Sequence, residues 1–124
     1  MIKTDSISKV FRTEEVETHA LINVSLEVKQ GEFVAIMGPS GCGKSTLLNI
    51  LGLLDRPTDG QYFFDGKDMC ALTEKERNVI RRGTLGFIFQ SFNLIDELTV
   101  EENIELPLLY MKVPADERKR RITD

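Results

Sequence analysis

Alternating hydrophobic and polar residues predict β structure at the start of the chain. Residues 20–28 have Ala, Ile, Val, Leu and Val at every second position, which predicts a half-buried strand in an antiparallel layer. A first strand is expected over residues 2–12, with the acidic stretch 13–18 as the loop between the two. A short strand is expected over residues 61–64, and the Asp-Gly pair at 65–66 is a strong hairpin-turn signal.

Two other segments are apolar without alternation. Residues 33–37 (Phe-Val-Ala-Ile-Met) and 85–89 (Leu-Gly-Phe-Ile-Phe) are each expected to form a buried strand, the second one buried on both faces. Residues 46–51 have the apolar face of a helix, and the helix is expected to start near Lys44.

Capping signals predict three helices after residue 70. A Thr-Glu-Lys-Glu capping box at 73–76 opens a helix through about residue 82, and Thr-Val-Glu-Glu at 99–102 opens another toward Pro107. Pro107 is expected to bend or end that helix, and Pro114 suits the N1 position of a last one. An antiparallel β layer, a β-α unit and following helices together predict an α/β protein.

The expected strand at 33–37 and the expected helix at 46–51 flank the sequence GPSGCGKST at residues 38–46. This segment fits G-x-x-x-x-G-K-[ST], the phosphate-binding P-loop. A plain glycine-rich loop is the alternative, and it is disfavoured because all four pattern positions and both flanking elements are present.

The residue types in the loop suit a nucleotide triphosphate. Gly38, Gly41 and Gly43 are expected to take positive φ and to let the backbone approach a ligand, so that successive N–H groups form an anion-binding nest. Lys44 supplies positive charge for the β- and γ-phosphates, and Ser45 offers a hydroxyl to Mg²⁺. The expected phosphate-binding residues are Gly38, Ser40, Gly41, Cys42, Gly43, Lys44, Ser45 and Thr46.

Composition and charge argue against several classes of protein. The chain has 124 residues, so it is one domain or part of one, and its net charge of −4 does not suggest nucleic-acid binding. The basic run at 118–121 is expected to be the solvated face of a helix. No apolar run is long enough to cross a bilayer and the first residues lack a signal-peptide core, so a cytosolic protein is expected. Cys42 and Cys70 have no metal-binding spacing and are expected to be reduced thiols.

With these motifs in place, the chain closely resembles the N-terminal half of an ABC transporter ATPase. The resemblance rests on GEFVAIMGPSGCGKSTLLNI at 31–50, FIFQSFNL at 87–94 and LTVEENI at 98–104, and it covers nearly the whole chain. The nearest group is the bacterial subfamily for macrolide export, lipoprotein release and peptide-antibiotic resistance. This resemblance implies a P-loop NTPase core with an N-terminal antiparallel β layer, which binds ATP with Mg²⁺.

The resemblance also implies roles for individual residues. Gln90 matches the family's Q-loop glutamine, which contacts Mg²⁺ and the attacking water, so Lys44 and Gln90 are the expected catalytic residues, with Ser45 and Gln90 at the metal. Phe11 matches the aromatic residue that stacks on adenine, with Val16 as a candidate neighbour. A core phenylalanine is the alternative for Phe11.

Partners follow from the same resemblance. The segment after Gln90 resembles the region that contacts membrane subunits, although local core packing explains its apolar side chains equally well; these are Phe92, Leu94, Ile95 and Leu98. The implied partners are the membrane-spanning permease subunits and a second ATPase domain. The implied location is the cytoplasmic side of the membrane, through the permease. His19 is expected to be structural.

The chain also departs from the family pattern. It has no LSGGQ motif, no Walker B strand ending in Asp-Glu and no later switch histidine. We therefore expect residues 1–124 to be the N-terminal part of one ATPase domain, truncated before the helical subdomain and the Walker B strand are complete. The β layer and P-loop are expected over about 1–90, and the Q-loop and start of the helical subdomain over about 90–124. Weak nucleotide binding without useful hydrolysis is expected for this piece, and oligomerisation is a hypothesis for how it covers open sheet edges.

Two other functions stay open on the sequence. One is a non-catalytic nucleotide-binding or interaction module. The other is a different P-loop NTPase or kinase, although a guanine-reading Asn-Lys-x-Asp segment is absent.

Overall fold

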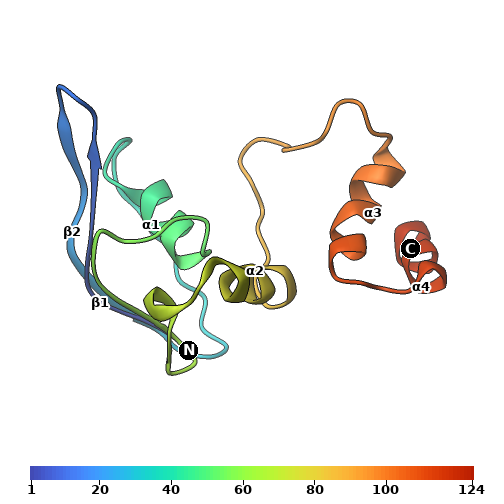
Figure 1. Cartoon of the computed structure of the whole chain (residues 1–124), viewed down its shortest axis with the longest axis horizontal. Coiled ribbons are helices and arrows are strands. Elements are labelled where there is room, and N and C mark those ends of the chain that lie inside the picture. The colour runs from blue at the N-terminus through green and yellow to red at the C-terminus, as the bar shows by residue number, and fades with distance from the viewer. The chain divides into compact units, whose positions relative to one another are not determined.

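The computed structural model describes residues 1–124 and divides into two compact units, Met1–Arg77 and Asn78–Asp124 (Figure 1). Its elements in chain order are β1 (Ile2–Arg12), β2 (Glu17–Val28), α1 (Lys44–Leu51), β3 (Asp59–Phe64), β4 (Lys67–Asp68), the 3₁₀ turn η1 (Met69–Ala71), α2 (Glu74–Gly83), α3 (Val100–Tyr110) and α4 (Ala115–Thr123). The expected α/β arrangement of an antiparallel layer beside a P-loop helix is confirmed in the first unit.

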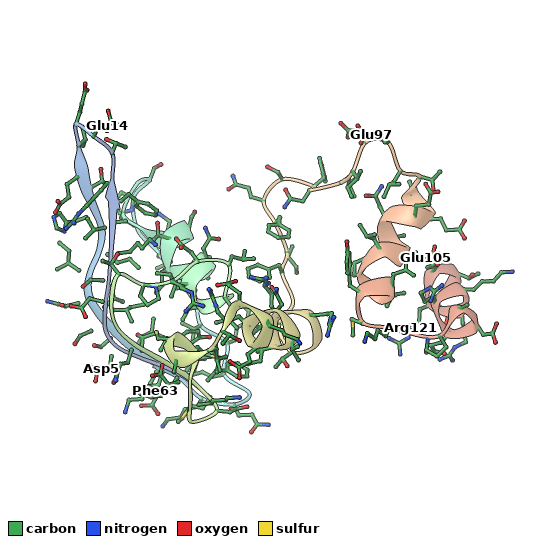
Figure 2. The ribbon with its side chains drawn as sticks, viewed as in Figure 1. Asp5, Glu14, Phe63, Glu97, Glu105 and Arg121 are labelled. Carbon is green, nitrogen blue, oxygen red and sulfur yellow. The ribbon has the colours of Figure 1, made fainter.

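One antiparallel sheet with strand order β2-β1-β3-β4 forms the first unit. β1 and β2 make a long hairpin whose turn carries Glu14 (Figure 2). β3 and β4 are joined at Asp65 and Gly66, whose φ angles of 49° and 79° are both positive, as a type I′ turn requires. The hairpin predicted from this Asp-Gly pair is therefore confirmed.

The core of the first unit lies between the sheet and α1. Ile7 and Leu21 of the sheet pack with Leu47 and Ile50 of the helix, all four side chains being buried. Tyr62 on β3 is also buried, and its hydroxyl donates a hydrogen bond of 2.7 Å to the carbonyl oxygen at the end of α1. These contacts fix α1, and so the loop before it, against β1 and β2.

The alternation predicted for residues 20–28 holds in only part of β2. Val24 and the inward residues after it follow the predicted pattern, but Leu21 is buried and Ile22 is 67% exposed, the reverse of the expectation. The cause is a bulge at Asn23. Ile7 pairs with Val24 and Lys9 pairs with Leu21, so one residue of β1 faces two residues of β2. An extra residue moves every later side chain to the opposite face of the sheet.

A second bulge faces the first one from β1. Ser6 and Asn23 take positive φ angles of 49° and 47°. Side-chain hydroxyls replace the missing ladder bonds, because the Ser6 amide donates to Ser25 Oγ at 2.9 Å and the Asn23 amide donates to Ser8 Oγ at 3.0 Å. On the other side of β1, Gly60 lies so close that a Cβ there would stand 2.5 Å from the Ser6 carbonyl oxygen.

The two strands predicted over 33–37 and 85–89 are wrong. Neither segment is assigned to a strand, and Phe33 is 96% exposed and Ile88 fully exposed. A strand needs hydrogen-bonded neighbours, and the sheet β2-β1-β3-β4 provides none for either segment. Ile36 alone packs against the core cluster.

The second unit consists of the end of α2 with α3 and α4, and Figure 2 labels Glu105 on α3 and Arg121 on α4. Thr99 and Glu102 form the predicted capping box at the start of α3. Pro107 does not end this helix, because its missing N–H removes one hydrogen bond while the Met111 amide still bonds to the Pro107 carbonyl at 3.1 Å.

Three of the four basic residues at 118–121 form ion pairs. Arg118 of α4 donates to Glu105 of α3 at 2.9 Å, and Arg120 and Arg121 both donate to Glu117. Hydrogen bonds from Arg120 and then Arg121 lower the pKa of Glu117 to about 2. Lys119, Arg120 and Arg121 are exposed, as predicted for a solvated helix face, whereas Arg118 is half-buried against Glu105.

None of the helices is both long and apolar enough to cross a bilayer.

Candidate functional site

The loop at 38–46 leads directly into α1. Gly43 is the N-cap residue with φ 93°, and Gly41 has φ 81°, so both take the left-handed conformation that was predicted for them. No side chain caps the helix, so the N–H groups of its first turn keep no side-chain partner. Such N–H groups and the positive end of the helix dipole favour an anion at this point.

Gly38 does not take the predicted positive φ. A Cβ there would stand 2.7 Å from Cys42 Sγ, so a larger residue would require this thiol to turn away. Gly43 is restricted by both conformation and space, since its Cβ would meet the Ala20 carbonyl oxygen at 2.4 Å. The end of the loop therefore rests directly on the backbone of β2.

Lys44 turns its side chain back across the start of the loop. Its Nζ donates to the carbonyl oxygens of Gly38 at 2.6 Å and Pro39 at 2.7 Å, and it lies 3.5 Å from Cys42 Sγ. Carbonyl oxygens hold the ammonium weakly compared with a phosphate oxygen, because the bond to phosphate joins two opposite charges. A phosphate oxygen would therefore displace these carbonyls as the partner of the ammonium.

The other loop residues differ in exposure. Ser40, Cys42 and Ser45 are exposed and Thr46 is half-buried. No group of three or more His, Cys, Asp or Glu side chains is gathered to hold a metal. A P-loop does not need such a group, since its protein ligands for Mg²⁺ are few and include one hydroxyl, for which Ser45 is the predicted residue.

Phe11 lies near the end of β1, where its backbone pairs with Thr18. The ring is 46% exposed, and Lys9 Nζ lies 5.2 Å from its centroid. A core phenylalanine, the alternative for this position, would be buried, so that alternative is wrong. Val16 is 60% exposed, and no contact places it beside Phe11.

His19 also lies on this hairpin. Its Nε2 is 3.0 Å from Glu17 Oε1 and the side chain is 54% exposed. It takes part in the ladder opposite Val10, in keeping with the structural role expected for it.

Gln90 belongs to the second unit and is exposed in an irregular segment. The P-loop residues are brought together by the first unit, and Gln90 keeps its catalytic role only as a prediction. Beyond it, a shallow cavity of about 330 Å³ is lined by Leu94, Ile95, Asp96, Leu98, Val100, Asn103 and Ile104. Phe92 is 92% exposed and does not line the cavity.

The sequence did not predict a polar network that holds the segment following α1. Arg77 is buried and donates to the carbonyl oxygens of Leu53 and Asp55, both at 2.9 Å, and to Glu74 at 2.7 Å. Lys9 reaches the same segment through the Asp55 carboxylate. The partners are 46 residues apart in the chain, so no local pattern signals them.

The uncapped helix, the left-handed glycines and the lysine thus meet in one loop of an α/β protein, in the arrangement predicted for a P-loop. Comparison with known proteins identifies the family of the chain. The ABC transporter family matches residues 21–124, and the chain therefore belongs to the ABC transporter family. The resemblance found in the motifs is thus confirmed.

Individual relatives place the chain within ATP-binding domains. The macrolide export ATP-binding/permease protein MacB of Brucella abortus (strain 2308) is 48% identical over 121 residues, which are 98% of this chain and 19% of MacB. An uncharacterised ABC transporter ATP-binding protein of Thermotoga maritima is 50% identical over 113 residues, 91% of this chain and 48% of that protein.

Among solved structures, the dimeric post-hydrolysis state of the ATP-binding cassette MJ0796 of Methanocaldococcus jannaschii, bound to ADP and Pi, is 46% identical with a TM-score of 0.91. The similarity covers 99% of this chain and 54% of that one. The chain thus spans about half the length of the ATP-binding proteins it matches, and about a fifth of MacB.

Proposed function

We propose that the loop at 38–46 binds the triphosphate of ATP together with Mg²⁺. The observation that carries this proposal is the meeting of three features at one point: the uncapped start of α1, the left-handed Gly41 and Gly43, and the Lys44 ammonium beside the loop carbonyls. Each favours an anion, and the Ser45 hydroxyl beside them suits the metal.

The proposed contacts divide the nucleotide among several residues. Backbone N–H groups of the loop, from Ser40 to Thr46, hold phosphate oxygens, and Lys44 carries the positive charge toward the β- and γ-phosphates. Mg²⁺ supplies charge neutralisation between these phosphates, with Ser45 and Gln90 as its protein ligands. Gln90 also orients the attacking water, and Phe11 stacks on the adenine ring.

For the whole protein we propose an ATPase subunit of an ABC transporter that couples ATP binding and hydrolysis to export or to lipoprotein release. The relative named as a macrolide export protein and the dimeric state of the ATP-binding cassette MJ0796 support this role. The proposed partners are membrane-spanning permease subunits and a second ATPase domain, at the cytoplasmic side of the membrane.

The test is calorimetric titration of the chain with Mg·ATP. Lys44→Ala removes one charge-assisted bond to phosphate, so its affinity should be about 10- to 100-fold lower. Lys3→Ala, which removes the same charge from an exposed position on β1, should bind like wild type. Equal affinity for wild type and Lys44→Ala would refute the P-loop assignment.

A further inference from the structure

Lys9 connects the strand that carries Phe11 with the segment that follows the P-loop helix. Its Nζ donates to Asp55 Oδ1 at 3.0 Å and to the Arg56 carbonyl oxygen at 2.7 Å. The side chain is only 15% exposed, although lysine is normally a surface residue. The position of the ammonium is therefore set by two partners in the segment after α1.

The two partners of Lys9 are themselves held in place by further hydrogen bonds. The Arg56 guanidinium donates to the Leu72 carbonyl at 3.0 Å and to the Glu74 carboxylate, while the Arg56 amide donates to Asp55 Oδ1 at 2.7 Å. Burial acts to raise the pKa of Asp55, but hydrogen bonds from Lys9 and the Arg56 backbone outweigh it and lower this pKa below its ordinary value. The carboxylate thus stays charged and keeps hold of the lysine.

From this position the ammonium faces the ring of Phe11. The distance of 5.2 Å from Nζ to the ring centroid is within the range of a cation–π interaction. Phe11 is 46% exposed, so part of the ring surface remains free for another ligand. A half-exposed ring whose position is set by a neighbouring ammonium is a prepared stacking surface, since less side-chain freedom is lost when a base binds.

We propose that Lys9 is a positioning residue for the adenine base. It holds the Phe11 ring at a fixed place relative to the segment behind α1, and so relative to the phosphate-binding loop at the other end of that helix. This inference rests on the proposed function, and it adds a residue that contacts neither phosphate nor base.

The test compares a ligand that has a base with one that has none. Lys9→Met keeps the length of the side chain and removes the charge. Its affinity for Mg·ATP should fall about 2- to 5-fold, the size of an exposed cation–π interaction, while its affinity for inorganic tripolyphosphate with Mg²⁺ stays unchanged. Lys9→Arg, which keeps both the charge and the partner for Asp55, should bind ATP within about 2-fold of wild type.

Two further variants make the result specific. In a Phe11→Leu background, Lys9→Met should cause no further loss of ATP affinity, because there is no ring to hold. Where Lys9→Met alone unfolds the chain by leaving Asp55 unpaired, the double variant Lys9→Met/Asp55→Asn removes that carboxylate and should show the same selective loss for ATP.

The outcomes separate this inference from the proposed function. Equal losses for ATP and tripolyphosphate in the double variant, or no loss for either, would overturn the role of Lys9 while leaving the P-loop in place. Failure of wild type to bind tripolyphosphate more tightly than Lys44→Ala would instead overturn the proposed function, and the role of Lys9 with it.

Discussion

Replacing Gly43 with alanine should disrupt the loop much more than the same change at Gly41. Both glycines are in the loop and have similar φ angles, 93° and 81°. An alanine in this left-handed conformation costs roughly 1–2 kcal/mol at either position. Only at Gly43 does the new Cβ also meet neighbours, at 2.4 Å from the Ala20 carbonyl oxygen and 3.0 Å from a methyl group of Leu21, whereas nothing lies within 4 Å at Gly41.

The collision at Gly43 adds a packing cost of about 1–3 kcal/mol, because either the loop or β2 must move. We therefore expect Gly43→Ala to lower the free energy of unfolding by about 2–5 kcal/mol, and Gly41→Ala by about 1–2 kcal/mol. Urea denaturation followed by circular dichroism measures both, and titration with Mg·ATP should rank the two variants in the same order. Equal destabilisation by the two substitutions would refute the view that contact with β2 fixes the end of the loop.

Three other predictions test the framework around the site. Burial raises the pKa of Tyr62 to about 12 from an ordinary value of 10, so the folded state binds the phenol proton more tightly than the unfolded chain does. The free energy of unfolding should therefore fall between about pH 10 and 12, and this fall should be absent in urea denaturation of Tyr62→Phe. Arg77→Met should lower the free energy of unfolding by about 2–4 kcal/mol, because it leaves buried carbonyl oxygens without a donor. The control Arg120→Met, at an exposed position, should change this free energy by less than about 0.5 kcal/mol. Similar effects of the two substitutions in thermal denaturation would contradict the role of Arg77. Alkylation of the exposed Cys42 by a bulky thiol reagent should abolish Mg·ATP binding, whereas the Cys42→Ser variant should still bind Mg·ATP after the same treatment. Loss of binding in both proteins would instead indicate that the half-buried Cys70 is the thiol whose alkylation matters.

Features that depend only on neighbouring residues were predicted best from the sequence. The turn at 65–66 and the capping box at 99–102 formed as expected, because each is decided within four residues. The start of α1 and the left-handed Gly43 follow from the P-loop pattern in the same way.

Features that depend on distant partners were predicted less well. The segments 33–37 and 85–89 have the composition of buried strands, yet a strand also needs neighbours, and composition does not report whether they are present. The shifted alternation in β2 has the same kind of cause, since the bulge at Asn23 depends on β1. The bonds from Lys9 to Asp55 join residues with no relation in sequence, and only the folded chain brings them together.

The paired bulges at Ser6 and Asn23 also limit how β1 and β2 can come together during folding. Two long strands of similar composition can pair with a slip of two residues and still bury the same face. Here a slipped pairing would put each left-handed residue opposite regular backbone and would leave the amides now bonded to Ser8 and Ser25 without acceptors. Misaligned hairpins should therefore be less stable than the native pairing, so the two bulges help to set the register of β1 and β2.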